Sequence, residues 1–240
     1  DVIRFAAEGA RAAEEAPSDQ TVPLTPMRRA IAERMTRSKQ AAPHFYVSID
    51  IDMSAIVQAR NSFAKDESRS APSINDFILS AGARVLRAFP PLNATFTDRG
   101  LTLHSEINLG MAVALEDGLV VPVIRRADEL SLEEIARRSR ELADKAQRKK
   151  LLPPDYQGGT FTVSNLGMFG VDHFVAIINP PEVAILAAGQ VRPRVVVHES
   201  GFAARPVMTA TLSADHRAVD GAIAARFLCR LKETLEKGPW

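Results

Sequence analysis

The feature that most constrains the fold is a strand, a turn and a helix in immediate succession near the C-terminus. Apolar and polar residues alternate over residues 207–212, which is the period of a half-buried strand. Residues 222–235 carry apolar side chains at helical spacing and predict an amphipathic helix. His216 therefore stands where the strand ends, and Asp220 stands where the helix begins. A negative charge at a helix N-terminus is stabilised by the helix dipole.

A histidine in such a turn has two interpretations. Imidazole is the side chain best suited to take up a proton near neutral pH, so His216 is a candidate general base. A His-x-x-x-Asp pair taken alone more often belongs to a half-buried histidine that bonds to the nearby aspartate. The turn by itself leaves both interpretations open.

Two further stretches, residues 159–170 and 178–186, carry motifs that bear on this choice. They read Gly-Thr-Phe-Thr-Val-Ser-Asn-Leu-Gly-Met-Phe-Gly and Ile-Asn-Pro-Pro-Glu-Val-Ala-Ile-Leu. Together with Asp-His-Arg-Ala-Val-Asp-Gly-Ala at 215–222, and in this order, they resemble the dihydrolipoamide acyltransferases. These are the core components of 2-oxo acid dehydrogenase complexes, and the pyruvate-type acetyltransferases are the most similar. The resemblance covers residues 22–236, and the family shares its histidine motif and fold with chloramphenicol acetyltransferase.

The order of the predicted elements favours an α/β fold with a mixed β-sheet flanked by helices. Strands and helices alternate without a regular βαβ repeat, which argues against a Rossmann fold or a barrel. The resemblance implies the same chloramphenicol acetyltransferase-like fold. We expect helix caps at Thr25, Asp52, Ser73 and Ser131. The predicted helices are 27–40, 53–65, 73–86, 131–150 and 222–235, and the predicted strands are 45–51, 93–97, 101–104, 107–115, 119–125, 160–165, 194–198 and 206–212.

The chain divides into three parts of different composition. With 240 residues and 46% hydrophobic content it can bury one large core, which we assign to a catalytic domain over 22–240. Residues 7–21 are rich in Ala and Glu, with Pro and Ser, and are typical of a linker. The resemblance implies that residues 1–6 are the tail of a truncated peripheral-subunit-binding domain.

The resemblance also implies a reaction and its residues. His216 would remove the thiol proton of coenzyme A or of dihydrolipoamide, and the thiolate would attack an acyl thioester. Ser164 would donate a hydrogen bond to the resulting oxyanion, and Asp220 would shape the site. The adjoining residues Asn165, Gly167, Met168 and Phe169 would line the substrate channel. Coenzyme A is a substrate here, and the lipoyl group would come from a lipoyl domain outside this chain.

Assembly is implied by the resemblance alone. We expect a homotrimer with the active site at the subunit interface, where the serine and the histidine come from different subunits. Trimers of this family build cubic or icosahedral cores that bind a dehydrogenase and dihydrolipoamide dehydrogenase. This chain ends Glu-Lys-Gly-Pro-Trp instead of in the leucine-rich tail that joins such trimers. The assembly beyond the trimer therefore stays open.

Composition excludes several other classes of protein. Thirty basic and 29 acidic residues leave no bulk charge for nucleic acid or a membrane surface, and no segment is apolar and long enough to span a bilayer.

His104, His173 and His198 are isolated, so no metal site is predicted. The single cysteine, Cys229, is expected to fill the core, and it fits a reducing compartment. We favour the bacterial cytoplasm over the mitochondrial matrix.

Three alternatives remain at this point. Ser164 and His216 are the nucleophile and base that a serine hydrolase requires, but the chain lacks the Gly-x-Ser-x-Gly elbow. A non-catalytic scaffold paralogue would form the same core, although the presence of both residues argues against it. Succinyl-specific relatives carry a second glycine at position 166 and branched-chain relatives an isoleucine, whereas this chain has Leu166.

Overall fold

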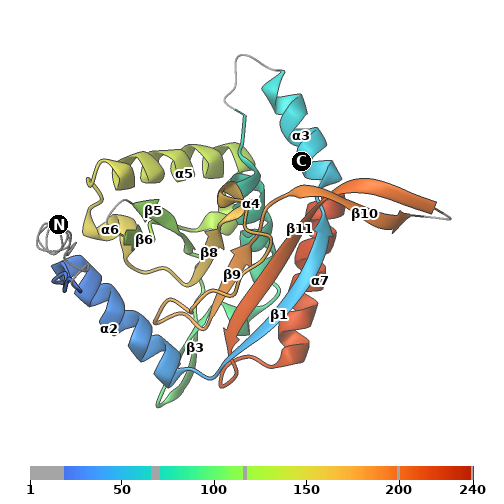
Figure 1. Cartoon of the computed structure of the whole chain (residues 1–240). Helices are drawn as coiled ribbons and strands as arrows, with labels where there is room; N and C mark the ends of the chain where they lie inside the picture. The colour runs from blue at the N-terminus through green and yellow to red at the C-terminus, as the bar shows by residue number, and fades with distance from the viewer. Residues whose placement is uncertain (1–18, 66–70, 116–117, 199–200, 239) are drawn as a thin grey trace, which may run out of the picture.

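The computed structural model describes residues 19–65, 71–115, 118–198, 201–238 and 240 (Figure 1). The predicted tail at 1–6 and most of the predicted linker at 7–21 lie outside the described residues. Among the described helices, none is long and apolar enough to cross a membrane.

A seven-stranded mixed sheet forms the centre of the structure. The pairs β4–β8 and β8–β9 are parallel and the other pairs are antiparallel, so the predicted mixed sheet is confirmed. Strand β10 pairs with the first half of β11, and the two project beyond the sheet as a hairpin (Figure 1). In spatial order the strands are β1 (His44–Asp52), β11 (Gly201–Asp215), β9 (Ala184–Ala188), β8 (Phe161–Asn165), β4 (Leu109–Met111) and β7 (Val123–Ile124), with β10 (Arg192–His198) beside β11.

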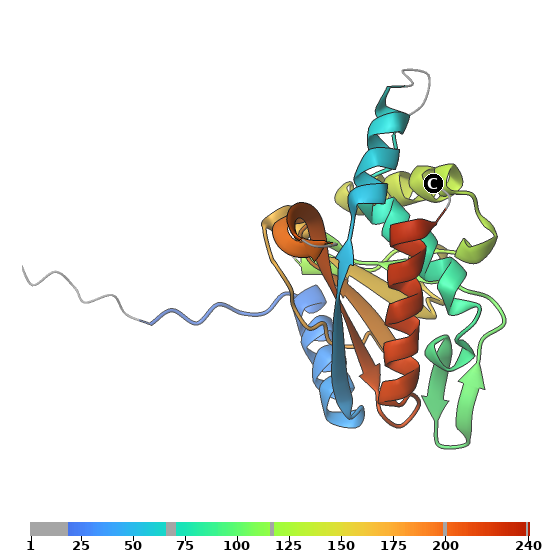
Figure 2. The same cartoon turned by 90° about the vertical axis from the view of Figure 1, so that its right-hand side faces the viewer.

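Helices lie on both sides of this sheet (Figure 2). Figure 2 shows α7 and α4 on one side of the strands and α2 on the other. The side towards α7 and α4 holds the apolar core, in which Phe227 of α7 contacts Phe89 and Phe161 through their rings. The α-helices are α2 (Pro26–Ala41), α3 (Ser54–Ala64), α4 (Ile74–Leu86), α5 (Leu132–Gln147), α6 (Pro153–Tyr156) and α7 (Gly221–Lys237), and the 3₁₀ turns are η1 (Pro90–Leu92), η2 (Ala127–Glu129) and η3 (Gly167–Phe169).

Strand register sorts the residues of the sheet into two chemically different faces. Residues paired across neighbouring strands point to the same side, and the next residue along each strand points to the other. One row of paired residues is wholly apolar and belongs to the core: Val47, Leu212, Leu186, Val163 and Met111. The row one residue away holds three hydroxyl side chains and one methyl: Ser48, Thr211 and Ser164, with Ala187 between the last two. We call these two sides the helix face and the polar face.

Local sequence signals place most helix ends correctly. Thr25 accepts a hydrogen bond from the Arg28 N–H, and Ser73 and Ser131 form complete capping boxes. Asp52 was predicted one residue too early, because Met53 occupies the cap position of α3. The Asp52 carboxylate nevertheless accepts the Ser54 N–H at 2.9 Å.

Two expectations are wrong. The predicted pair 107–115 and 119–125 is not continuous: β4 and β7 join the main sheet, whereas β5 (Val113–Leu115) and β6 (Gly118–Val120) form a separate hairpin. Pro122 has no N–H to donate, so the ladder is interrupted there. Cys229 is exposed instead of filling the core. It follows Leu228 on α7 and so lies about 100° around the helix from that buried residue. The remaining hairpin, β2 (Ala94–Thr97) with β3 (Gly100–Leu103), is as predicted.

Candidate active site

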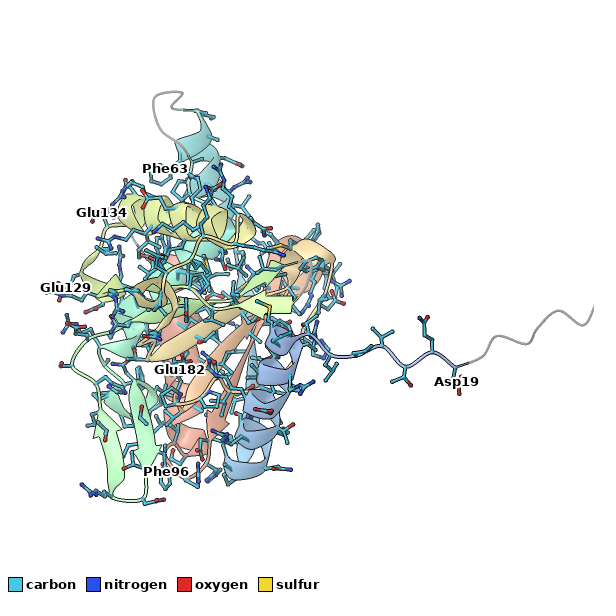
Figure 3. The ribbon with its side chains drawn as sticks, turned by 90° about the vertical axis from the view of Figure 1, so that its left-hand side faces the viewer. Asp19, Phe63, Phe96, Glu129, Glu134 and Glu182 are labelled. Atoms are coloured by element: carbon cyan, nitrogen blue, oxygen red, sulfur yellow. The ribbon has the colours of Figure 1, made fainter. Side chains whose placement is uncertain are left out.

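The turn after β11 is fixed by an ion pair. The buried carboxylate of Asp215 accepts hydrogen bonds from the Arg217 guanidinium: Nε donates to Oδ1 at 3.0 Å and to Oδ2 at 3.2 Å, and Nη2 donates to Oδ2 at 2.7 Å. It also accepts the backbone N–H of Arg217 at 3.0 Å. The guanidinium lies over the ring of Phe96, at the lower end of the molecule in Figure 3, with 4.2 Å to the ring centroid. Hydrogen bonding to Asp215 raises the pKa of Arg217, so the guanidinium keeps its charge at any physiological pH.

His216 sits between these two residues. Its N–H donates to the carbonyl of Pro43 at 3.0 Å, and its ring lies 4.9 Å from the ring of Phe45. The side chain itself is exposed. The turn therefore presents an accessible imidazole on a backbone that is bonded on both sides.

Asp220 begins helix α7. Its Oδ1 accepts the Ile223 N–H at 2.8 Å, which is the bond of an N-cap. Among the hydrogen bonds of the described residues, none joins Asp220 to His216. The aspartate thus acts on the turn through the start of α7.

The other predicted site residues gather at the end of β8. Ser164 is buried on the polar face, and Asn165 follows it at the strand end. The Asn165 Oδ1 accepts the Gly167 N–H at 2.8 Å, which turns the chain into η3. On that turn Met168 and Phe169 are 78% and 62% exposed. The five residues form one cluster, and its two large apolar side chains are mostly uncovered by the described part of the chain.

This turn is held by close backbone contact. A Cβ on Gly167 would lie 2.8 Å from the carbonyl oxygen of Gly189, so only glycine permits the approach. Gly170 has φ of 77°, which is the left-handed region that glycine adopts readily. The turn itself therefore requires glycine at both positions, in addition to the predicted place of Gly167 in the substrate channel.

Strand register separates the serine from the histidine. Ser164 pairs with Ala187, which in turn pairs with Thr211 of β11. His216 follows Thr211 by five positions, so the two site residues lie about 17 Å apart along the strands and two strand spacings, or about 10 Å, across them. Within one chain they cannot contact the same substrate atom. This also removes the serine hydrolase alternative in the form of a Ser–His pair in one chain.

Sequence reasoning missed two features of the site. Asp215 and Arg217 flank His216 with opposite charges, and that spacing alone signals the ion pair. Glu182 lies in the second motif and received no role, yet it is 6% exposed and burial raises its pKa to about 8. Throughout the described ranges, no three His, Cys, Asp or Glu side chains are grouped so as to hold a metal ion.

The chain matches a family model over residues 16–239, described as the 2-oxoacid dehydrogenases acyltransferase (catalytic domain). It is 44% identical over 226 residues to a mitochondrial protein of Schizosaccharomyces pombe, the dihydrolipoyllysine-residue acetyltransferase component of the pyruvate dehydrogenase complex. That match covers 92% of this chain and 47% of the relative. The chain thus spans about half the length of the curated relatives it matches.

Solved structures show the same likeness. The cubic core of the pyruvate dehydrogenase multienzyme complex superposes with a TM-score of 0.88 at 33% identity, covering 93% of this chain and 94% of the other. A dihydrolipoamide acetyltransferase of Azotobacter vinelandii also gives 0.88 at 33% identity, with 92% of each chain covered. Chloramphenicol acetyltransferase, at 15% identity and a TM-score of 0.53 over 85% of this chain and 94% of its own, shares the fold.

The Azotobacter structure belongs to a study of a serine, a histidine and an asparagine in the catalytic mechanism. That serine and histidine are separated along their chain by the same number of residues as Ser164 and His216 here. The asparagine follows its histidine at the position where this chain carries Asp220. Motifs, fold and matched length agree, and this chain belongs to the 2-oxoacid dehydrogenase acyltransferase family.

Proposed function

We propose that this chain transfers an acetyl group between coenzyme A and the thiol of dihydrolipoamide. The observation that carries the proposal is the exposed imidazole of His216 on a turn fixed by Asp215 and Arg217. It is supported by the spacing to Ser164, which is that of the serine and histidine studied in the Azotobacter acetyltransferase.

The chemistry follows from the acidity of thiols. Only a few per cent of a free thiol is ionised at neutral pH, so a base that accepts its proton raises its reactivity. His216 takes that proton, and the thiolate attacks the carbonyl carbon of the acyl thioester. The hydroxyl of Ser164 donates to the oxyanion that forms, an interaction worth about 3 kcal/mol of barrier. The leaving thiolate then departs and takes the proton back from His216.

A second copy of the chain completes this site. Since Ser164 and His216 of one chain lie about 17 Å apart along the strands, we assign each site the histidine of one subunit and the serine of its neighbour. A homotrimer satisfies this arrangement for every subunit. A structure at 33% identity is described as a cubic core of the pyruvate dehydrogenase complex, which supports a core role for this chain together with the dehydrogenase components and a lipoyl domain. We place that complex in the bacterial cytoplasm or the mitochondrial matrix.

The projecting hairpin supports assembly. Val195 and Val197 of β10 and Phe202 of β11 are 74%, 78% and 83% exposed. Val197 pairs with Phe202 and Val195 with Ala204, so one face of the hairpin is entirely apolar. A two-stranded ribbon is marginal in water, and an exposed apolar patch of this kind typically marks a contact surface. A neighbouring copy would cover it.

Acetyl is the favoured acyl group. Three curated relatives that are 41–44% identical to this chain are acetyltransferase components of pyruvate dehydrogenase complexes. Leu166 also stands where succinyl-specific relatives carry glycine and branched-chain relatives isoleucine. Acetyl, succinyl and branched-chain donors compared on one preparation decide this point.

The decisive experiment measures acetyl transfer from acetyl-coenzyme A to free dihydrolipoamide by the wild type and by His216→Ala. The variant should lose at least about a hundredfold in kcat, because general-base catalysis is worth about 10²–10⁴ in rate. It should keep the oligomeric state of the wild type. A well-formed wild-type oligomer without transfer would leave the scaffold alternative, and full activity of His216→Ala would remove the histidine from the mechanism.

Subunit mixing tests the shared site. Ser164→Ala and His216→Ala chains, each nearly inactive alone, are denatured together and refolded as mixed oligomers. Some interfaces then unite a wild-type serine with a wild-type histidine, and activity should return to roughly a quarter of the wild-type value by random assortment. If mixed oligomers form and stay inactive, the two residues act within one subunit or not together.

A further inference from the structure

We infer that Glu182 is a positioning residue of the histidine turn: it fixes segment 178–183, which accepts the backbone N–H of Asp215 directly and bonds to the side chain of His44, next to the residue that accepts the His216 N–H. The inference rests on the proposed function for the reaction that the turn performs. It assigns Glu182 no contact with substrate. Figure 3 shows this residue over the sheet beside α2.

The carboxyl group of Glu182 is enclosed by uncharged partners. Its Oε1 accepts a hydrogen bond from Asn179 Nδ2 at 3.1 Å, and its own N–H donates to the Asn179 carbonyl at 3.1 Å. A Cβ on Gly159 would lie 3.0 Å from that Oε1, so bare backbone makes room for the carboxyl. The second oxygen, Oε2, is buried and has no partner among the described residues. Such an oxygen is tolerated far better in an uncharged carboxyl than in a carboxylate.

Segment 178–183 contacts the histidine turn directly at one end. The carbonyl of Val183 accepts the N–H of Asp215 at 2.9 Å. Asp215 is the residue whose carboxylate bonds to Arg217 and shapes the turn. A displacement of Glu182, the neighbour of Val183, is therefore passed to the residue before His216 through a single hydrogen bond.

The other end of the segment reaches the turn through His44. The N–H of Ile178 donates to His44 Nε2 at 3.1 Å, and His44 Nδ1 lies 2.8 Å from the carbonyl of Ala42. This pattern requires a neutral ring with its proton on Nδ1. The adjacent residue, Pro43, accepts the N–H of His216. The backbone N–H groups of Asp215 and His216 thus both depend on segment 178–183, the first directly and the second through His44 and Pro43.

Helix α2 holds the outer side of the segment. The Ser38 hydroxyl donates to the Ile178 carbonyl at 2.6 Å, and the Arg34 guanidinium donates to the Pro180 carbonyl. Because both bonds go to backbone, the Arg34 guanidinium is not the ion-pair partner that a buried carboxylate would need. Its charge acts on Glu182 only from a distance.

Protonation of Glu182 therefore sets the state of the segment. Burial raises the pKa of Glu182 to about 8, against the opposing effects of Thr162, Asn179 and the charge of Arg34. The charged or titratable groups on the elements around it are Arg34 of α2, Asp215 of β11, and His104 and Glu106. The last two line a cavity of about 320 Å³ that also borders Gly159 and Pro181. Above about pH 8 the Glu182 carboxyl group loses its proton. Either the resulting carboxylate stays buried with one oxygen unpartnered, or segment 178–183 opens to let water reach it.

The test compares wild type with Glu182→Gln, Glu182→Ala and the exposed control Glu233→Gln. Glutamine has the shape of the protonated glutamic acid side chain and is likewise uncharged. Glu182→Gln should therefore stay within about threefold of the wild-type kcat near pH 7. Glu182→Ala removes the contact and should lose about tenfold or more in kcat with a smaller change in KM, because small misplacements of a catalytic group are costly. Wild type and Glu233→Gln should lose kcat above about pH 8, and Glu182→Gln should not.

A readout without substrate separates this inference from the proposed reaction. The His216 ring resonances, identified by their loss in His216→Ala, should show an additional movement between about pH 7 and about pH 9 in the wild type, caused by the ionisation of Glu182. In Glu182→Gln that additional movement should be absent. Identical resonance shifts or identical alkaline limbs in the two proteins overturn the inference, as does wild-type kcat in Glu182→Ala. If wild type transfers no acetyl group, the proposed function fails and the resonances alone decide the role of Glu182.

Discussion

Two adjacent rows of residues in the same sheet have different roles: one row packs in the apolar core, and the other carries hydroxyl groups that include the proposed catalytic serine. Val47, Leu212, Leu186 and Val163 face the helices and are buried or nearly so, whereas Ser48, Thr211 and Ser164 stand one residue away on the polar face. A strand reverses its side chains at every step, so a single backbone path serves both rows. Substitutions at two neighbouring positions of one strand should therefore have different effects, the first on stability and the second on activity.

The largest expected effect is on the helix face. Leu212→Ala removes a fully buried side chain and should lower the free energy of unfolding by about 2–5 kcal/mol. Its neighbour Thr211→Val keeps the volume and loses the 2.8 Å hydrogen bond to Ser48, so it should cost about 1 kcal/mol. Denaturant unfolding of the two variants measures the contrast, and equal losses would contradict the division between the faces.

On the polar face, Ser164→Ala should reverse the pattern. We expect kcat to fall about a hundredfold or more with little change in KM, because the hydroxyl would serve the transition state and not the bound substrate. The unfolding free energy should change by less than about 1 kcal/mol. Ser48→Ala on the same row is the matched control, and a comparable loss of kcat there would remove the special role of Ser164.

A third effect depends on pH. The pKa of Glu182 is raised from 4.5 to about 8 in the folded chain, so between these values the folded state holds a proton that the unfolded chain has released. Stability should therefore fall as pH rises, by about 1.4 kcal/mol per pH unit, or about 3 kcal/mol between pH 5 and pH 7. Glu182→Gln has no such ionisable group, so its free energy of unfolding should fall less than that of the wild type between pH 5 and pH 7. Parallel stability curves would show that the carboxyl is not buried as described.

The smallest effect concerns Asp220. Because its carboxylate caps α7 at the Ile223 N–H, Asp220→Ala should cost about 1 kcal/mol of stability. Asparagine caps equally well, so Asp220→Asn should be nearly neutral in unfolding, and the Azotobacter protein carries asparagine at the corresponding spacing. If Asp220→Asn loses activity while keeping stability, the carboxylate has a role in the reaction that its capping bond does not explain.

The helix face and the helix ends were predictable because their signals are local. Capping boxes at Ser73 and Ser131 span four residues, and the alternation at 207–212 identifies β11. The split between β4–β7 and β5–β6 depends on where Pro122 falls relative to a partner strand. The position of Cys229 was misjudged by a single helical step.

The site was predictable only in part. Resemblance pointed to His216 and Ser164, but their distance apart follows from the pairing of three strands. The environment of Glu182 was hidden for a related reason. Gly159, Thr162 and Asn179 enclose its carboxyl from separate segments, and no spacing in the chain records that they meet there.

The separation of Ser164 from His216 also has a consequence for how activity depends on concentration. If each site draws one residue from each of two subunits, a chain released from the ribosome is inert until it finds its neighbours. Specific activity should then decline on dilution below the dissociation constant of the oligomer, while the fold of each subunit persists. Reactive thioesters would meet a competent catalyst only where the complex has been assembled.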